Sequence, residues 1–343
     1  MDHRSVFRWL SLFVVVSSLG LGLSAQVQTI AVTGVNVVDV VDGRIIPDST
    51  VLVVGETIRS VTRNGNPPSG AQRIDGRGKF LIPGLWDMHT HIEGNENAWL
   101  PLCIANGVTG IRDMGADLDF ILNIREATRS GRVFGPRIIA AGPILDDAPG
   151  DWPFRMRVRN ADEGQAAVRL LKRRGVDLIK VHNNTPRDAF FAIAEEAHQQ
   201  QLPVAGHVPL KVTIQKGIDA GMLSIEHLGE DGRVWKACSG GRQYDAKACR
   251  PFFEMMAKRA VWQTPTLIAL AEMPVIGTPA SKISRDQLAF ANKRFLDMQA
   301  ANQAFFINKP EILAVLKSQA EVAKTVTPTW QQPESVFWPG ATR

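Results

Sequence analysis

Four histidines and one lysine stand at the ends of apolar segments, and side chains of these types could hold metal ions. His89 and His91 lie two residues apart, so on an extended backbone both side chains point to the same side. His207 and His227 each close a short apolar run. Imidazole nitrogen is a preferred ligand of zinc-type ions. One histidine at such a position is usually structural, whereas four of them together with Lys180 predict a metal site.

Lys180 is unusual because it lies near the end of an apolar run over residues 177–181. A side chain that faces the interior at such a position should be apolar or paired. In one interpretation its ammonium group reaches the rim and pairs with a nearby carboxylate. In the other, a desolvated amine adds carbon dioxide and becomes a carbamate, whose two oxygens can bridge two metal ions. The residues alone leave both interpretations open.

The elements that must position these residues alternate between short apolar strands and helical segments, which indicates a parallel sheet built from βαβ units. This pattern predicts an α/β fold, a TIM-type (β/α) barrel, with a doubly wound open sheet as the alternative. We expect helices over 162–174, ending at Gly175, and from an N-cap at Thr185 to Gln200. The expected strands cover residues 85–89, 108–112, 137–141, 177–181, 203–207, 223–227 and 261–266.

Residues 28–83 have a different pattern, with short Val- and Ile-rich strands and a predicted hairpin turn at 55–57. Beyond Thr266 the chain is predicted to be helical through Phe305 and to end in a tail rich in Pro and Trp. We find no apolar strand with a terminal acid in that region. The sequence therefore predicts a barrel that lacks its last strand.

Three further polar residues adjoin the predicted site. Asp113 is expected either to pair with Arg112 or to make hydrogen bonds at the rim. Strand alternation predicts that Glu226, next to His227, faces outward in an ion pair. His182 could line a pocket or lie in a solvated loop.

Composition and the N-terminus exclude some classes of protein and indicate a compartment. The net charge is +5 and basic residues are scattered, which argues against a nucleic-acid partner. Residues 1–25 have a basic start, an apolar stretch and a small-residue exit, which is typical of a secretory signal peptide and predicts a periplasmic or secreted protein without a membrane anchor after cleavage. Of three cysteines, Cys103 is expected to be a buried thiol, and a bridge between Cys238 and Cys249 is left open.

The motifs, taken in order, resemble the amidohydrolase superfamily, closest to its imidazolonepropionase-like and Xaa-Pro dipeptidase (prolidase-like) branch. The similarity runs over about residues 28–270. The residues that carry it are Ile74-Asp75-Gly76, Leu81-Ile82-Pro83-Gly84-Leu85-Trp86-Asp87-Met88-His89-Thr90-His91, Gly107-Val108-Thr109 with Arg112-Asp113, Ile179-Lys180, Gly206-His207 and Ile225-Glu226-His227.

The resemblance implies a composite β-sandwich beside the barrel and two zinc ions. His89 and His91 would hold one ion, His207 and His227 the other, and carboxylated Lys180 would bridge them. Metal-bound hydroxide would then cleave an amide or peptide-like C–N bond in a small molecule, such as an Xaa-Pro dipeptide or a cyclic amide. The resemblance leaves a homo-oligomer open.

The chain departs from this family pattern after about Phe306. Relatives place an aspartate at the end of the eighth strand, where it orients the hydroxide and moves its proton. No such aspartate is identified here, which predicts a truncated or frame-shifted C-terminus and weak or absent turnover. The alternative function is therefore a catalytically inactive metal-binding remnant. The expected parts are a leader at 1–25, the N-terminal part of the sandwich at 26–83, barrel strands one to seven at 84–306 and an atypical tail at 307–343.

Overall fold

The computed structural model describes residues 28–92, 96–148, 154–227 and 245–272, with scattered positions between 275 and 304. The chain divides into two compact units, the first ending at Pro83 and the second beginning at Gly84. The predicted leader, the tail at 307–343 and the segment in which an eighth strand was sought lie largely outside the described residues. Within the described part of the chain, no helix has the length and apolar character that crossing a membrane requires.

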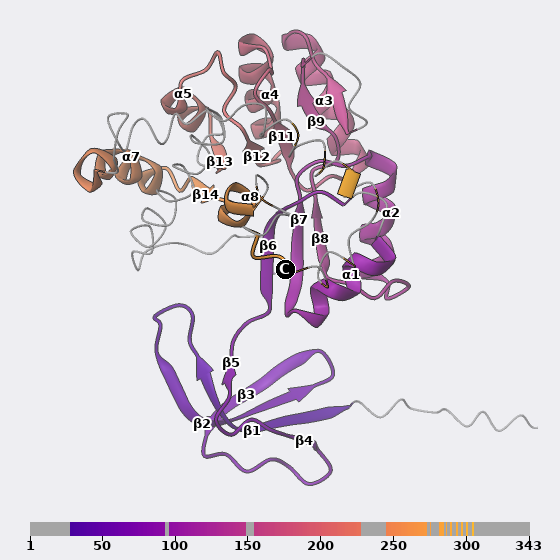
Figure 1. Cartoon of the computed structure of the whole chain (residues 1–343), viewed down its shortest axis with the longest axis vertical. Coiled ribbons are helices and arrows are strands. Elements are labelled where there is room, and N and C mark those ends of the chain that lie inside the picture. Colours follow the sequence, from indigo (N-terminus) through magenta and orange to yellow (C-terminus); the bar gives the residue numbers. More distant parts are fainter. Residues whose placement is uncertain are drawn as a thin grey trace, which may run out of the picture. The chain divides into compact units, whose positions relative to one another are not determined.

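The first unit is a five-stranded sheet in which β1 is the central strand (Figure 1). β1 pairs with β2 in antiparallel register and with β4 and β5 in parallel register. The predicted hairpin is confirmed, because β2 turns into β3 at Gly55, whose φ of +60° suits glycine. The strands are β1 (Thr29–Val38), β2 (Ile45–Val54), β3 (Thr57–Arg63), β4 (Gln72–Asp75) and β5 (Phe80–Leu81).

The second unit consists of parallel strands that alternate with helices (Figure 1). All seven predicted strands are confirmed to within two residues, and β9 and β10 were not predicted. The strands are β6 (Leu85–Thr90), β7 (Val108–Asp113), β8 (Arg137–Ala140), β9 (Ile144–Asp146), β10 (Arg155–Arg157), β11 (Ile179–Val181), β12 (Val204–Gly206), β13 (Met222–Glu226) and β14 (Trp262–Thr264). The helices are α1 (Glu96–Ala105), α2 (Leu118–Arg129), α3 (Ala161–Arg174), α4 (Arg187–Gln199), α5 (Ile214–Asp219), α7 (Ala246–Lys258) and α8 (Leu267–Glu272).

Strand order favours the barrel over the doubly wound alternative. One parallel sheet runs β6-β7-β8 and the other runs β10-β9-β11-β12-β13-β14. Only β10 interrupts the order in which the strands follow one another along the chain. A doubly wound sheet reverses its strand order at a switch point, and no reversal occurs among β11 to β14. The Asp177 amide donates to the Ala140 carbonyl at 2.9 Å, which joins the start of the fourth predicted strand to β8.

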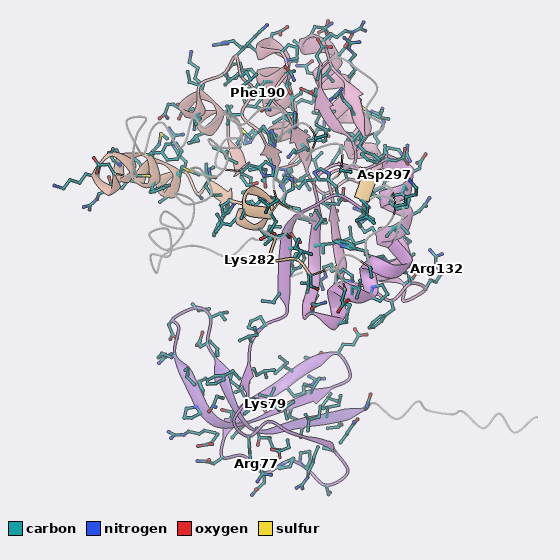
Figure 2. The ribbon with its side chains drawn as sticks, in the orientation of Figure 1. Arg77, Lys79, Arg132, Phe190, Lys282 and Asp297 are labelled. Atoms are coloured by element: carbon teal, nitrogen blue, oxygen red, sulfur yellow. The ribbon has the colours of Figure 1, made fainter. Side chains whose placement is uncertain are left out.

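The helices bury the outward faces of the strands. One apolar cluster joins β11, β12 and β13 to α3, α4 and α5, and it includes Phe190 of α4, which Figure 2 labels. A second cluster packs α1 and α2 against β7 and β8. Helix α3 ends at Gly175 as predicted, because Gly175 adopts φ +83° and caps the last turn. The N-cap predicted at Thr185 is wrong. Pro186 occupies that position, and the Thr185 hydroxyl donates to the Leu145 carbonyl instead.

The two cysteines in the described part of the chain differ in bonding state. Cys103 is a buried free thiol, as predicted. Burial raises its pKa to about 11, so it carries little thiolate near neutral pH. Cys249 of α7 is disulfide-bonded. The remaining cysteine of the sequence, Cys238, lies outside the described residues.

Candidate functional site

The four predicted histidines come together at the carboxyl ends of three parallel strands. His89 is the penultimate residue of β6. His91, His207 and His227 directly follow β6, β12 and β13, respectively. The His89 ring centroid lies 5.2 Å from that of His91 and 4.4 Å from that of His227. The His207 and His227 centroids are 5.0 Å apart. The four imidazoles therefore form one cluster.

Lys180 lies in the middle of β11 with 1% of its surface exposed. Its neighbour in register on β12 is Ala205. A Cβ atom on Gly206 would stand 2.9 Å from the Lys180 Cδ and 2.2 Å from the Val181 carbonyl oxygen, so glycine at this position leaves room for the lysine side chain. The Lys180 charge also contributes, after burial, to the lowered pKa values of His89 and His207. The amine is therefore within electrostatic reach of the histidine cluster.

Each of the four histidines has its Nδ1 atom at hydrogen-bond distance from an oxygen. The His89 Nδ1 lies 2.8 Å from the Glu226 carboxylate and the His91 Nδ1 lies 2.8 Å from the Gly115 carbonyl. Because these oxygens can only accept, both Nδ1 atoms carry the proton, and in the neutral ring Nε2 carries the lone pair. A histidine that binds a metal ion through Nε2 needs this tautomer.

The other two histidines have weaker constraints of the same kind. The His207 Nδ1 lies 3.2 Å from the Asn183 side-chain oxygen. The His227 Nδ1 lies 2.6 Å from the Thr266 hydroxyl, which can accept or donate. All four rings thus have an oxygen partner at Nδ1.

Burial favours the neutral form of His89, His91 and His207. It lowers the pKa of His89 to about 4, against the opposing effect of Glu226. Burial, followed by the Lys180 charge, holds the pKa of His207 well below its usual range. Neutral imidazole is the form that binds metal, so no proton has to leave these rings near neutral pH.

The donor set fits two metal ions only if Lys180 is modified. Within the described ranges, no three His, Cys, Asp or Glu side chains stand close enough together to hold an ion unaided. The predicted arrangement does not require such a trio, because each ion would take one histidine pair and an oxygen of the carboxylated lysine. The paired imidazoles, the Nδ1-protonated tautomers of His89 and His91 and the space beside Gly206 are consistent with that ligand set.

The outward ion pair predicted for Glu226 is wrong. Glu226 has no exposed surface, and its carboxylate lies 2.8 Å from Arg112 Nη2 and 2.8 Å from His89 Nδ1. Alternation failed because His227 adopts φ +57°, which turns the chain at the end of β13 and lets adjacent residues both face the site. An acid and an arginine on two apolar strands, β13 and β7, are the sequence signal that could have predicted this pair.

Asp113 makes the rim hydrogen bonds that were one of its two predicted roles. Its carboxylate accepts from the Ile92 amide at 2.8 Å and from the Gly115 amide at 3.1 Å. These bonds fix the chain segments that follow β6 and β7. Asp113 therefore holds the loop that carries His91.

His182 lines the cluster. Its ring lies 4.1 Å from the His207 ring, measured between centroids, and its Nδ1 is 3.7 Å from the carboxylate of Asp146. Asp146 is fully buried at the end of β9, and the same carboxylate oxygen lies 3.4 Å from Arg155 Nε. Asp146 was not predicted as a site residue because β9, which it ends, was not predicted.

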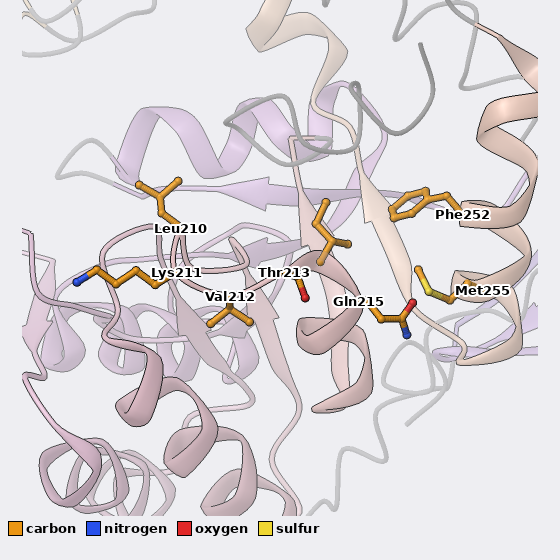
Figure 3. A pocket seen from close by; sticks show the side chains of 8 residues that line it. Leu210, Lys211, Val212, Thr213, Gln215, Phe252 and Met255 are labelled. Atoms are coloured by element: carbon orange, nitrogen blue, oxygen red, sulfur yellow. The ribbon is translucent and has the colours of Figure 1, made fainter. Parts of the chain in front are cut away.

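A separate pocket of about 510 Å³ lies beside the loop that follows His207. It is lined by residues 210–215 and by Phe252 and Met255 of α7 (Figure 3). None of the five predicted ligands lines it. Most of the residues that line the pocket are apolar, and the pocket lies between α5 and α7. We therefore do not assign it to the histidine cluster.

Comparison with known proteins identifies the family. A model of the amidohydrolase family matches residues 80–294. Ochratoxinase of Aspergillus niger is 26% identical over 219 residues, which cover 46% of this chain and 45% of that protein. Adenine deaminase of Chelativorans sp. (strain BNC1) is 28% identical over 194 residues, covering 52% of this chain and 32% of that protein. The matched part thus spans less than half the length of these curated relatives.

The fold likeness is broader than the sequence likeness. The solved structure of a Xaa-Pro dipeptidase with bound methionine superimposes with a TM-score of 0.60 over 90% of this chain and 78% of that one, at 18% identity. This likeness supports an α/β architecture with an N-terminal sheet and parallel strands. The family match covers more than half of the chain and includes His89, His91, Lys180, His207 and His227. The chain belongs to the amidohydrolase family.

Proposed function

We propose that this protein is a metal-dependent hydrolase that cleaves an amide or peptide-like C–N bond in a small molecule or dipeptide. The observation that carries the proposal is the convergence of His89, His91, His207 and His227, each oriented through Nδ1, beside buried Lys180. Family membership supports C–N bond hydrolysis in general. The Xaa-Pro dipeptidase likeness favours a dipeptide substrate over a cyclic amide.

Two zinc ions would be held at this cluster. His89 and His91 would bind one, His207 and His227 the other, and Lys180 would supply the bridge. For this the neutral Lys180 amine adds to carbon dioxide, forming an N–C bond and losing one proton, and the product is a carbamate with two oxygens. When bound, such a pair of ions lowers the pKa of a water molecule and polarises a scissile carbonyl.

The protein's own residues would orient the ligands and keep water from the strand interior. Leu178, two residues before Lys180, and Ala205, its neighbour in register, belong to a small buried apolar cluster with Met114 and Ala141. Met114 and Ala141 directly follow β7 and β8, and Leu178 directly precedes β11. The low polarity of this cluster would strengthen the electrostatic interactions of a bound substrate.

No catalytic acid or base is assigned. The aspartate that the family resemblance implies would lie after β14, and most of that segment is outside the described residues. A metal-binding chain without hydrolytic activity is therefore the competing hypothesis, and the same experiment separates the two.

The test is a metal count joined to a substrate panel. The full chain is purified with zinc and bicarbonate, its metal content is measured, and Xaa-Pro dipeptides, other dipeptides, cyclic amides and adenine are assayed for hydrolysis. We expect about two zinc ions per chain and release of an amino acid from at least one dipeptide. Two bound ions with no turnover of any compound would support the inactive remnant, and a metal-free chain would refute the proposal.

Variants make this test specific. His89→Ala together with His91→Ala should lose one zinc ion, and Lys180→Met should lose the bridge and both zinc affinity and activity. His198→Ala is the matched control, since His198 is an exposed histidine of α4. It should bind zinc and turn over substrate as the unaltered chain does.

We also propose that the protein acts in the periplasm or is secreted, on the basis of the leader pattern at residues 1–25. N-terminal sequencing of the protein recovered from a periplasmic fraction should find a start near residue 25 or 26. Recovery of the uncleaved chain from the cytoplasm alone would contradict this assignment.

A further inference from the structure

A buried chain of polar groups connects β7 to His89 through β13. The Arg112 guanidinium donates to the Glu226 carboxylate at 2.8 Å and to the Ser224 hydroxyl at 2.8 Å. It also donates to the Met88 carbonyl at 2.7 Å and to the Thr264 hydroxyl at 3.0 Å. These contacts join β6, β7, β13 and β14 beneath the histidine cluster.

The carboxylate of Glu226 divides its two oxygens between different partners. Its Oε1 accepts from Arg112 at 2.8 Å and from Ser224 at 2.6 Å, whereas its Oε2 faces the His89 Nδ1 at 2.8 Å. Arg112 and Glu226 each have at most 1% of their side chains exposed. With Oε1 held by Arg112, the second oxygen has one orientation, which is toward the imidazole.

From this geometry we infer that Glu226, fixed by Arg112, is a positioning residue that holds His89 in the Nδ1-protonated tautomer. The inference rests on the proposed function, because that tautomer presents Nε2 as the ligand atom for the ion shared with His91. Partners of this kind beyond the ligands typically change metal affinity by about 10–100-fold when removed. The inference assigns such a role to two residues that bind no metal themselves.

A single substitution distinguishes tautomer control from simple packing. In Glu226→Gln one oxygen becomes an amide NH₂ group of similar size. Arg112 can only donate, so the remaining amide oxygen turns toward Arg112 and the NH₂ group turns toward His89. The His89 Nδ1 must then accept, and the proton moves to Nε2. A role in packing alone would leave the tautomer unchanged.

The experiment is nitrogen NMR of ¹⁵N-histidine-labelled, metal-free full-length chain, with the His89 signals assigned by their loss in His89→Ala. We expect Nδ1–H in the unaltered chain and Nε2–H in Glu226→Gln. Zinc titration of the same samples should show one of the two sites weakened by about 10–100-fold in Glu226→Gln. Glu196→Gln is the matched control, because Glu196 pairs with Arg169 between two helices at 2.8 Å, away from the cluster, and it should change neither result.

Two outcomes would overturn the inference: Nε2–H at His89 in the unaltered chain, or Nδ1–H with normal zinc affinity in Glu226→Gln. Ser224→Ala provides a second variant should Glu226→Gln not fold. It removes one bond to Oε1 but leaves Arg112 in place, so His89 should remain Nδ1-protonated, and a change of tautomer would again contradict the inference. A chain that binds no zinc would refute the proposed function, while the NMR result would still decide the role of Glu226.

Discussion

Replacing Arg112 by methionine removes the guanidinium that links four strands and leaves a side chain of similar length. The Glu226 carboxylate, with no exposed surface, then lacks its cationic partner. Breaking a buried ion pair from one side costs about 3–5 kcal/mol. The Met88 carbonyl also loses its bond, whereas the hydroxyls of Ser224 and Thr264 can rotate to other partners. We therefore expect Arg112→Met to lower the free energy of unfolding of the second unit by about 4 kcal/mol.

Urea unfolding followed by tryptophan fluorescence measures this loss in the correct unit, because residues 28–83 contain no tryptophan. Arg169→Met is the matched control. Its pair with Glu196 has the same 2.8 Å separation, but the Arg169 side chain is 44% exposed, so the expected loss is at most about 1 kcal/mol. Equal losses in the two variants, or a loss below about 1.5 kcal/mol in Arg112→Met, would refute the claim that burial makes the Arg112 pair structurally important.

Two further predictions follow from the same residues. In the metal-free chain, the pKa of His89 is about 4 in the folded state, below its ordinary value of 6.5, so the unfolded chain binds the proton more readily. The contribution of His89 to the free energy of unfolding is therefore fully present above pH 6.5, and it should fall by on the order of 3 kcal/mol as the pH drops to 4. Urea midpoints at several pH values would show this dependence reduced in His89→Ala and retained in His198→Ala, and equal slopes in both variants would contradict it. Gly206→Ala places a methyl group 2.2 Å from the Val181 carbonyl oxygen at φ +128°, and it should cost more than about 4 kcal/mol and lower zinc content. Gly43→Ala is the control, because Gly43 has a positive φ of +74° but a Cβ atom there would meet no atom within 4 Å. A thermal melt of this variant should show a loss of stability of only about 1–2 kcal/mol. A similar loss in both variants would exclude crowding at Lys180 as the cause.

The sequence predicted the strands well because each one is a short apolar run between helical segments. β11 and β12 were recognisable since apart from Lys180 residues 178–181 and 203–206 are apolar or glycine, and both segments end beside a histidine. β9 and β10 were missed because neither lies in an apolar run: β9 ends at the first of two consecutive aspartates, Asp146 and Asp147, and two of the three residues of β10 are arginine. The Thr185 cap was missed because the hydroxyl found a tertiary partner, the Leu145 carbonyl, that local sequence does not reveal.

The convergence of the candidate ligands was predictable from the sequence, and the groups that orient them were less so. His89, His91, His207 and His227 were identified by position alone, because parallel strands bring their carboxyl ends to one edge. Glu226 was assigned to the wrong face because alternation assumes a regular strand. Its partner Arg112 lies 114 residues away in the chain, so only the folded topology pairs them.

The irregular backbone around the site explains how the strands present adjacent polar residues. A regular strand directs alternate residues to one face, so Glu226 and His227 could not both face the cluster. His227 departs from regular strand geometry with φ +57°. Thr266, which contacts His227 just beyond the end of β14, has φ +46°. Non-glycine residues adopt such angles only where the surroundings compensate for the strain. Here the His227 amide donates to the Thr264 carbonyl at 2.9 Å, and the His227 Nδ1 lies 2.6 Å from the Thr266 hydroxyl. The strain therefore lies where two strand ends meet at a predicted ligand, which is the place where a functional requirement would keep it.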